Sequence, residues 1–315
     1  MKITVLDAAT LGADLDLTPL AALGELCVFD ATAPHEVAAR LSDTDVAVIN
    51  KVKITAEGLA GNTRLRMIAE CATGYDNIDL AACRAHGVAV ANVVGYSTDS
   101  VAQVTVAMAL SLSTNLSAFT DCTADGSYTE EGIANRLIPV YHELAGKTWG
   151  IVGYGHIGGK VAAVARALGC RVIAFSRSPK EGVEQTDLHT LCRTADVISV
   201  HLPLTPETRG IIGAQEIAMM KRDAVFINVA RGAVTDEAAL ADAVAEGRLG
   251  GIGVDVYSVE PFPKEHPFYA IRRLPNVCLT PHMAWGAYEA RARCLFEICR
   301  NIEAFARGDR RNRVD

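Results

Sequence analysis

A glycine-rich turn carries the clearest chemical signal in the sequence. Gly153, Gly155 and Gly158 stand in the spacing G-x-G-x-x-G, directly after an apolar run that predicts a buried strand. In such a turn the first glycine permits a tight bend, the second lets a pyrophosphate approach the backbone, and the third lets a helix pack on the strand. The first helical turn, here His156, Ile157 and Gly158, then offers unpaired N–H groups to phosphates. A purely structural turn is the alternative, but strand, helix and next strand are all present, so we predict a dinucleotide-binding unit.

The residues after the second strand of this unit bear on the choice of nucleotide. An Asp or Glu about 20 residues beyond the glycines ordinarily bonds the adenosine ribose hydroxyls. Here that place holds Ser176 and Arg177. A carboxylate would repel a 2′-phosphate, whereas arginine and serine can hydrogen-bond to it. Stacking of Arg177 on adenine, with either cofactor bound, is the alternative, and we expect NADP(H) in preference to NAD(H).

Three polar residues follow three different predicted strands: Arg231, Glu260 and His282. Ligands of open parallel sheets bind beyond the carboxyl ends of the strands. Reduction of a 2-oxo acid needs these residue types, because a histidine can donate a proton to the carbonyl oxygen. A nearby carboxylate holds the imidazole and favours its protonated form, and a guanidinium polarises the carbonyl and orients the substrate carboxylate.

Each of these three residues also has a structural explanation. His282 follows Pro281 and fits a turn histidine, while Glu260 fits a solvated loop acid and Arg231 a capping cation. The spacing alone does not bring them together.

The elements that must position these residues alternate between short apolar runs and helical patterns, which predicts an α/β fold with parallel sheets. The expected strands of a first series are Ile3–Leu6, Leu26–Phe29, Val46–Ile49, Met67–Glu70 and Val88–Asn92, with helices at His35–Leu41 and Leu80–His86. A long apolar helix is expected over Ser97–Leu116, followed by an irregular polar stretch, Thr120–Arg136.

A second α/β series follows. Its expected strands are Thr148–Val152, Arg171–Phe175, Val197–Val200, Ala224–Asn228, Gly251–Val256 and Val277–Thr280. A last helix pattern runs from about Ala287 to Ala306. It comes too late to cover the second sheet simply, so we expect it to return to the first domain.

Composition fits a globular protein of two domains. The 315 residues are 50% hydrophobic and 21% charged, with a net charge of −7 and no long basic tract. This balance argues against a nucleic-acid partner, whose phosphates require a concentrated positive face. No stretch reaches the roughly 18 apolar residues of a membrane span, and the N-terminus does not resemble a signal peptide. We expect a soluble, cytoplasmic protein with no membrane partner.

Nine cysteines are dispersed without C-x-x-C pairs or metal-site spacing. This pattern is typical of reduced, buried thiols in a reducing compartment. We expect neither disulfides nor a metal site.

The motifs together resemble those of the D-isomer-specific 2-hydroxyacid dehydrogenase family. They read GYDNIDLAACRAHGVAVANVVGYSTDSVAQ, ELAGKTWGIVGYGHIGGKVA, HLPLTPETRGIIG, INVARGAVTDEAAL, GVDVYSVEP and LTPHMAWG, and cover nearly the whole chain. The resemblance implies two similar Rossmann-like or flavodoxin-like α/β domains with a cleft between them, and a homodimer. It also implies a discontinuous substrate domain, residues 1–97 plus 286–315, and a dinucleotide-binding domain, residues 98–285.

The resemblance also assigns roles by position. Arg231 is expected to bind and polarise the substrate, Glu260 to partner the histidine, and His282 to be the acid/base. The expected substrate contacts are the backbone N–H groups of Thr73 and Gly74, with Lys51 as a further charge or, alternatively, a plain surface lysine. Asp255 is expected to hold the nicotinamide carboxamide. The rest of the expected cofactor lining is Thr105, His201, Leu202, Pro203, Val229 and Ala230.

The sequence departs from the family in ways that affect its specificity. Gln103 stands where many relatives have Glu, and Ala230 where Ser is frequent. Within the family, GYSTDSVAQ and NRLIPVYHELAGKTWGI are most similar to glycerate dehydrogenases, also called hydroxypyruvate reductases. We expect hydroxypyruvate and D-glycerate as the main pair and glyoxylate as a side substrate. The alternatives are D-lactate, a branched D-2-hydroxy acid, or a nucleotide-sensing binding protein without enzymatic activity.

Overall fold

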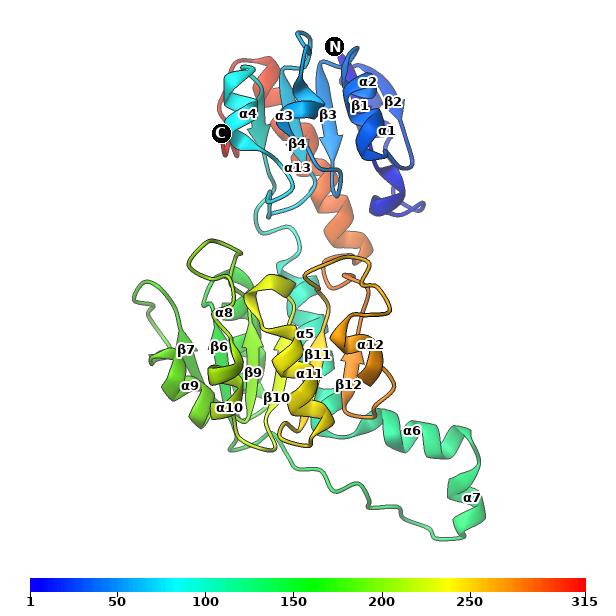
Figure 1. Cartoon of the computed structure of the whole chain (residues 1–315), viewed down its shortest axis with the longest axis vertical. Helices are drawn as coiled ribbons and strands as arrows, with labels where there is room; N and C mark the ends of the chain where they lie inside the picture. The colour runs from blue at the N-terminus through cyan, green and yellow to red at the C-terminus, as the bar shows by residue number, and fades with distance from the viewer. The chain divides into compact units, whose positions relative to one another are not determined.

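The computed structural model describes all 315 residues, which divide into two compact units. Unit 1 comprises Met1–Ser97 and Gly286–Asp315, and unit 2 comprises Thr98–Trp285. In Figure 1 the two stretches of unit 1 are blue to cyan and red, and unit 2 runs from teal to orange. Each unit is an α/β structure built on one parallel sheet, which agrees with the predicted fold class.

Unit 1 contains a five-stranded parallel sheet in the order β2-β1-β3-β4-β5. The central strand β3 is an uninterrupted buried apolar run, and β4 is buried throughout and apolar up to its last residue, Glu70, as expected for a parallel sheet with both faces covered. The strands are β1 (Lys2–Val5), β2 (Glu25–Val28), β3 (Val46–Ile49), β4 (Met67–Glu70) and β5 (Ala89–Ala91). The predicted bounds of β3 and β4 are confirmed, and those of the other three are within one or two residues.

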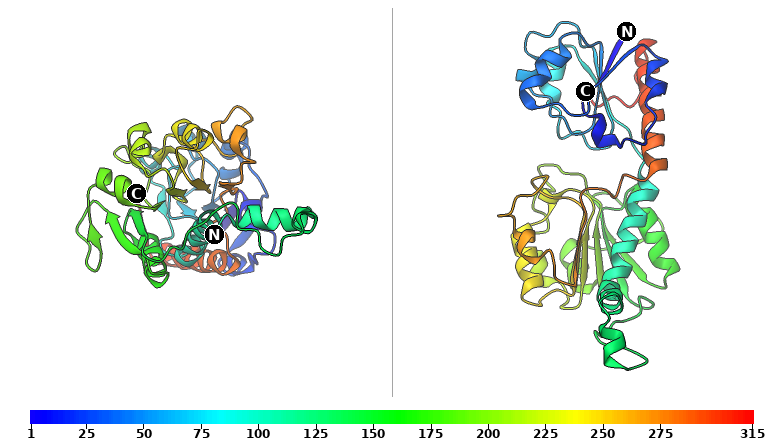
Figure 2. Two further views of the ribbon diagram at one scale, coloured as in Figure 1. Left: turned by 90° about the horizontal axis from the view of Figure 1, so that it is seen from below. Right: turned by 90° about the vertical axis from the view of Figure 1, so that its right-hand side faces the viewer.

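Helices cover both faces of this sheet, as the right-hand view of Figure 2 shows. One face carries α2 (Val37–Leu41), α3 (Ala56–Leu59) and α4 (Leu80–Ala85). The other carries α1 (Thr18–Ala21) and the last helix, α13 (Tyr288–Ala306), which packs on β4 and α1. The apolar side chains of α13 recur every three or four residues, so this helix buries one face on a sheet made some 200 residues earlier.

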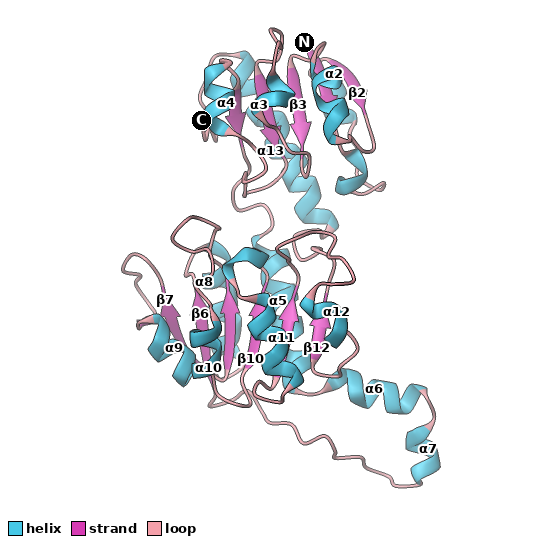
Figure 3. Cartoon of the chain, viewed as in Figure 1, coloured by secondary structure: helices cyan, strands magenta, loops and turns pink.

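Unit 2 contains a seven-stranded parallel sheet in the order β12-β11-β10-β9-β6-β7-β8, drawn as magenta arrows in Figure 3. Read from β6, its first six strands follow the 3-2-1-4-5-6 order of dinucleotide-binding folds. The strands are β6 (Thr148–Val152), β7 (Arg171–Phe175), β8 (Glu184–Gln185), β9 (Val197–Val200), β10 (Val225–Asn228), β11 (Gly251–Val254) and β12 (Val277–Leu279). Only β8, an exposed two-residue edge strand, was not predicted.

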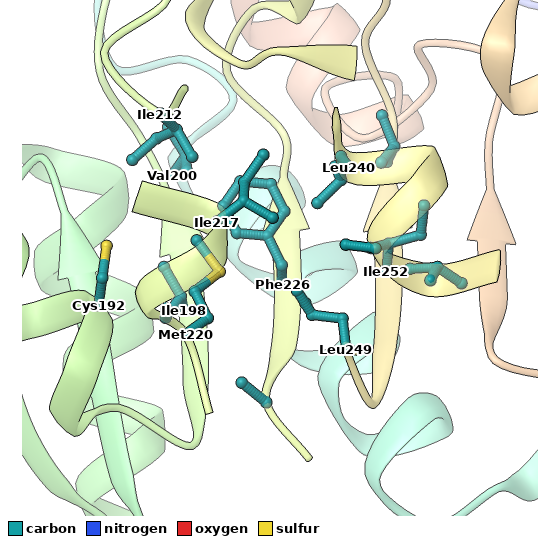
Figure 4. Packing of buried hydrophobic residues seen from close by; sticks show 14 of the residues in the cluster. Cys192, Ile198, Val200, Ile212, Ile217, Met220, Phe226, Leu240, Leu249 and Ile252 are labelled. Carbon is teal, nitrogen blue, oxygen red and sulfur yellow. The ribbon is translucent and has the colours of Figure 1, made fainter. Parts of the chain in front are cut away.

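Two layers of helices enclose this sheet. On one face α5 (Thr98–Ser113) and α8 (His156–Ala167) pack together. On the other lie α9 (Leu188–Thr194), α10 (Ala214–Met219), α11 (Glu237–Ala245) and α12 (Pro267–Ile271). Figure 4 shows part of the core between this second layer and the strands, where Phe226 is fully buried among aliphatic side chains.

The segment after α5 differs from its prediction. Asn115 adopts a left-handed conformation (φ 52°), so α5 ends at Ser113 and α6 (Leu116–Ala124) starts a new helix. A short helix, α7 (Ser127–Glu131), lies within the stretch expected to be irregular. We call residues 114–143 the arm, because Figure 1 shows them projecting from the body of unit 2. The irregular prediction for Thr120–Arg136 was therefore wrong over most of its length.

The arm is held together by its own contacts. The Tyr128 hydroxyl donates to the carbonyl oxygen of Ala134 (2.9 Å), and Arg136 pairs with Glu131 (2.9 Å). The rings of Phe119 and Tyr141 meet edge to face at 6.0 Å.

No single helix is long and apolar enough to cross a membrane. Together, α5 and α6 have the length and the apolar composition of a membrane span, but the pair is bent by 68°. All nine cysteines are free thiols, and seven of them are buried.

Candidate active site

The glycine-rich turn joins β6 to α8 at the point where the strand order of unit 2 reverses. Gly153 has φ +100°, a conformation that side chains rarely tolerate, and a Cβ there would lie 2.8 Å from the backbone of His201. A Cβ on Gly158 would lie 2.2 Å from the carbonyl oxygen of Gly153. Both glycines are therefore required by the packing of the turn itself.

Gly155 is different, because a Cβ at this position would meet no atom within 4 Å. The residue precedes α8, whose first N–H groups belong to His156, Ile157 and Gly158. Open space beside a helix N-terminus suits a phosphate group. The three glycines thus have the roles that the motif predicts: Gly153 and Gly158 allow the turn to pack, and Gly155 leaves space for a phosphate. The turn therefore fits a dinucleotide.

His201 follows β9, the strand beside β6. Its Nε2 lies 3.0 Å from Ser199 Oγ, which also accepts a hydrogen bond from Trp149 Nε1 (2.9 Å). Burial lowers the pKa of His201 to about 3, so the ring is neutral. Its Nδ1 atom is buried without a hydrogen-bond partner, and Leu202 packs against the position of Gly153. Pro203 completes the turn and is exposed. An unpartnered polar atom beside the glycine turn fits a site that receives a polar ligand.

The strand β7 ends at Phe175, and Ser176 and Arg177 follow it. The Ser176 hydroxyl donates to the carbonyl oxygen of Ser178 (2.8 Å) and accepts from Gln185 Nε2 (2.6 Å). Gln185 lies on the unpredicted strand β8. Arg177 is exposed, and no carboxylate takes part in the Ser176 contacts. The Glu207 carboxylate interacts electrostatically with Arg177.

Three further predicted cofactor residues lie within unit 2. The fully buried Thr105 donates its hydroxyl hydrogen bond to the carbonyl oxygen of Val101 within α5 (2.7 Å). Val229 and Ala230 follow β10, where Asn228 Oδ1 accepts from the N–H of Ala230 (3.0 Å). Their contact with a cofactor stays a prediction.

Glu260 and His282 form the central pair of unit 2. Their side chains meet at 2.7 Å between Oε2 and Nδ1, and the side chains are 30% and 19% exposed. The other carboxylate oxygen of Glu260 accepts the N–H of Tyr257 (3.0 Å). His282 follows β12 with φ 53°, a strained conformation for a histidine that occurs mainly where the surroundings enforce it. The predicted pairing of these two residues is therefore present, with the Glu260 carboxylate holding the histidine at its Nδ1 atom.

Asp255 fixes the segment that carries His282. Its carboxylate accepts hydrogen bonds from Thr280 Oγ1 (2.5 Å) and from the N–H groups of Met283 and Ala284 (both 2.9 Å). Burial raises the pKa of Asp255, and these hydrogen bonds oppose the rise. Its predicted contact with the nicotinamide carboxamide stays a prediction.

Arg231 follows β10 and is half-buried, with its Nη1 donating to the carbonyl oxygen of Ala230 (2.8 Å). The next residue, Gly232, has no room for a side chain, because a Cβ would lie 2.1–2.2 Å from the backbone of Tyr257 and Ser258. The chain segment that carries Arg231 is thus packed directly on the segment that carries Glu260.

The predicted substrate residues Lys51, Thr73 and Gly74 belong to unit 1 and follow the neighbouring strands β3 and β4. The Thr73 hydroxyl donates to the carbonyl oxygen of Val93 (2.8 Å), and its own carbonyl oxygen accepts from Asn92 Nδ2 (2.7 Å). No protein acceptor receives the N–H of Thr73 or Gly74. These two N–H groups are therefore available to an anion, and Lys51 has an exposed side chain.

Two buried acids that the sequence analysis missed hold these loops. Asp7 accepts the N–H groups of Asn50 (3.0 Å), Lys51 (2.5 Å) and Val52 (3.0 Å). Glu70 Oε2 accepts from Asn77 Nδ2 (3.1 Å), while its Oε1 is buried without a partner. Burial raises the pKa of both carboxyl groups, that of Glu70 well above its usual range.

Comparison with known proteins places this geometry in context. Residues 106–284 match the family described as D-isomer specific 2-hydroxyacid dehydrogenase, NAD binding domain. This match covers most of unit 2.

Relatives extend the similarity over the whole chain. The chain is 38% identical to the glycerate dehydrogenase of Methylorubrum extorquens, over 90% of this chain and 89% of that protein. It is 34% identical to the hydroxypyruvate reductase of Blautia hydrogenotrophica, over 100% of both chains. Among solved structures, an acyclic imino acid reductase in complex with NADPH and D-Arg superposes with a TM-score of 0.89, at 30% identity over 100% of both chains.

Proposed function

Because the chain belongs to the D-isomer-specific 2-hydroxyacid dehydrogenase family, whose members are oxidoreductases acting on CH–OH groups, we propose that it reduces hydroxypyruvate to D-glycerate. The observation that carries the proposal is the 2.7 Å contact between Glu260 and His282 beyond the carboxyl ends of the parallel strands of unit 2. A carboxylate that holds one imidazole nitrogen leaves the other to exchange a proton with a substrate oxygen.

In this reaction His282 is the acid. Its Nε2 donates a proton to the carbonyl oxygen as that oxygen gains negative charge, and Glu260 stabilises the cationic ring at Nδ1. A bound reduced nicotinamide supplies the hydride. In the oxidative direction His282 takes the proton back from the hydroxyl group.

The remaining polar groups bind and orient the substrate. The Arg231 guanidinium polarises the carbonyl and pairs with the substrate carboxylate. The N–H groups of Thr73 and Gly74, which have no protein acceptor, receive that carboxylate, and Lys51 adds a positive charge. Asp255 accepts a hydrogen bond from the nicotinamide carboxamide in addition to its protein donors.

The cofactor proposal is a preference for NADP(H) over NAD(H). Its support is the segment after β7, where Ser176 and the exposed Arg177 replace the acid that would repel a 2′-phosphate. The structurally similar imino acid reductase is in complex with NADPH. We expect Arg177→Ala to weaken NADPH binding by about tenfold, the loss of one charge-assisted contact, and to leave NADH binding unchanged. Equal losses for both cofactors would leave Arg177 as an adenine-stacking residue.

The arm supports a homodimer. Several large apolar side chains lie exposed on it, including Leu137 (74%), Ile138 (73%) and Val140 (69%). A concentration of exposed large apolar side chains on one segment is typical of an interaction site. We propose that a second copy of the chain covers it.

Light scattering on an eluting size-exclusion peak tests the dimer. Leu137→Asp with Ile138→Asp should halve the measured mass, since each charge would have to be buried without a partner. Phe296→Asp removes an exposed apolar side chain (61%) outside the arm and should leave the mass unchanged. Dimers that persist in the double variant would refute the role of the arm.

The activity test follows the absorbance of reduced nicotinamide, with NADPH and NADH each offered hydroxypyruvate, glyoxylate, pyruvate and a branched 2-oxo acid. Fastest oxidation with NADPH and hydroxypyruvate is the expected result. Faster turnover of pyruvate or the branched acid would replace the substrate proposal by a D-lactate or branched-acid dehydrogenase. No oxidation of any acid despite cofactor binding would refute the proposed function.

A further inference from the structure

A second acid–histidine pair lies behind the first in unit 2. Glu237 Oε2 is 3.1 Å from His266 Nε2, and the two side chains are only 10% and 6% exposed. The same carboxylate accepts the N–H of Ser258 at Oε1 (2.9 Å) and the Ser258 hydroxyl at Oε2. One buried carboxylate therefore joins α11, the start of α12 and the loop between β11 and α12.

The contact made by Nδ1 of His266 fixes which ring nitrogen donates to Glu237. Nδ1 faces the N–H of Phe268 at 3.3 Å and must act as an acceptor there. Nε2 then carries the hydrogen and donates it to Glu237. The imidazole also packs against the rings of Phe262 and Phe268, at centroid distances of 5.1 and 5.2 Å. The ring cannot turn without losing both hydrogen bonds.

Capping does not account for the Glu237 carboxylate. The N-cap of α11 is Asp236, whose own side chain accepts the N–H of Ala239 (3.0 Å). Glu237 is the next residue, and its carboxylate contacts only the Ser258 loop and His266 among the hydrogen bonds of this region.

The Ser258 loop leads directly to the acid/base pair. Tyr257 donates its N–H to Glu260 Oε1, and Glu260 Oε2 contacts His282. The backbone of Tyr257 and Ser258 is also the surface on which Gly232, next to Arg231, is packed. A displacement at Ser258 would therefore reach all three residues of the proposed acid/base and substrate-binding set.

We propose that Glu237 and His266 are positioning residues that hold the 257–260 loop, and through it Glu260 and the Arg231 segment, in the reactive arrangement. The inference rests on the proposed function, because it assigns Glu260 and His282 to proton transfer. It adds a buried acid–histidine pair that touches neither substrate nor cofactor.

The test is Glu237→Gln. The glutamine side chain has nearly the same volume, but its NH2 group faces a hydrogen-bond donor of Ser258 or His266 where the carboxylate offered an acceptor. Because Nδ1 of His266 already accepts a hydrogen bond, its Nε2 cannot become an acceptor for this NH2 group. We expect kcat with hydroxypyruvate and NADPH to fall about tenfold, which is about 1.4 kcal/mol of transition-state stabilisation. The dissociation constant of NADPH, read by fluorescence, should stay within about twofold because the glycine turn is not touched.

Matched variants separate positioning from general damage. Asp242→Asn changes an exposed acid of the same helix and should match the wild type. Ser258→Ala should lower kcat less than Glu237→Gln does, and Ser258→Thr, which keeps the hydroxyl, should restore it. A Glu237→Gln enzyme with wild-type kcat would overturn the inference, as would an equal loss in Asp242→Asn.

A readout independent of activity distinguishes failure of this inference from failure of the proposed function. The imidazole proton of His282 that points to Glu260 should give a downfield 1H resonance, identified by its loss in His282→Gln. We expect Glu237→Gln to shift or broaden this resonance and Asp242→Asn to leave it unchanged. An unchanged resonance in Glu237→Gln would overturn the positioning role even if the wild type reduced none of the acids offered.

Discussion

The strand order reverses once in each of the two sheets. The residues that follow the first strand at this reversal differ between the two sheets: glycines in unit 2 and an aspartate in unit 1. In unit 2 the reversal lies between β6 and β9, where Gly153 and Gly155 keep side chains away and a helix N-terminus faces open space. In unit 1 it lies between β1 and β3, where the Asp7 carboxylate accepts three consecutive N–H groups of the neighbouring loop.

Such a position at a parallel sheet ordinarily binds an anionic ligand. In unit 1 the Asp7 carboxyl group takes this place and accepts the N–H groups of the neighbouring loop, so the chain itself fills the crevice there. Unit 2 leaves the equivalent place to an external phosphate. The place beside the first strand thus stays open to a phosphate where glycine follows that strand, and is closed by the chain's own carboxyl group where aspartate follows it. The neighbouring loops of unit 1 keep the substrate-binding role proposed for Thr73 and Gly74.

The largest expected effect concerns the reactive side chain of unit 2. His282→Ala should lower turnover by about a hundredfold or more, because the proton donor is lost. NADPH affinity should stay close to that of the wild type, since the glycine turn is unchanged. Stopped-flow turnover and fluorescence titration measure the two quantities, with the exposed His35→Ala as control. Near-wild-type turnover would refute the acid/base assignment.

Next in size is the effect of the buried Asp7 carboxyl group of unit 1. Asp7→Ala leaves the N–H groups of Asn50, Lys51 and Val52 without an acceptor, which should lower the free energy of unfolding by about 2–3 kcal/mol. Urea denaturation measures the change, and the exposed Asp30→Ala should stay within about 0.5 kcal/mol of the wild type. A neutral effect of Asp7→Ala would mean that the loop does not depend on this carboxylate.

Gly155→Val tests the open space of unit 2. No protein atom lies within 4 Å of the added Cβ, so the melting temperature should barely change. The side chain would fill the space for the pyrophosphate and should weaken NADPH binding by about tenfold. Gly159→Ala, one turn into α8, is the matched control and should bind NADPH normally. Unimpaired binding by Gly155→Val would remove the pyrophosphate from this position.

The smallest effect is expected from Glu70→Gln. Because burial raises the pKa of Glu70 well above its usual range, the folded state binds a proton at this carboxyl group more tightly than the unfolded state does. Stability is then fully present below the unfolded pKa and falls as pH rises toward the folded pKa. The groups around Glu70 are Asn77, Asp7, Lys51 and Cys294.

Glutamine cannot ionise, so the variant should melt about 2–4 °C above the wild type at pH 8, the shift that roughly 1 kcal/mol gives in a chain of this size. At pH 4 the difference should vanish. A difference that does not vary with pH between 4 and 8 would show that Glu70 is ionised in the fold.

Much of the molecule could be predicted because local pattern and global fold agree. The buried runs of β3, β4, β6, β7 and β9 gave their exact bounds, and the glycine spacing located the turn. The Glu260–His282 contact followed from the family motifs rather than from spacing, since 22 residues and two elements separate the partners.

The features that the sequence did not predict share one physical cause. The groups that stabilise or explain them lie far away in the sequence. Many apolar residues of the arm are exposed, so their spacing does not follow the buried face of a helix. The sequence pattern therefore did not reveal the helices α6 and α7. Asp7 binds backbone N–H groups 43–45 residues away, which no side-chain pattern reveals. Glu237 and His266 look like ordinary helix-start residues in the sequence, and their contact appears only when the two helices are packed together.

The return of α13 to unit 1 has a consequence for synthesis on the ribosome. The sheet of unit 1 emerges first, yet the helix that packs on β4 and the closing contact of Asp315 with Val90 are translated after all of unit 2. At about 5–20 residues per second this delay lasts about 10–40 s. Unit 2 can fold during that interval, whereas one face of the nascent first sheet has only α1 and not yet α13 to cover it. We therefore expect unit 1 to complete its packing after unit 2, although its sheet is translated first.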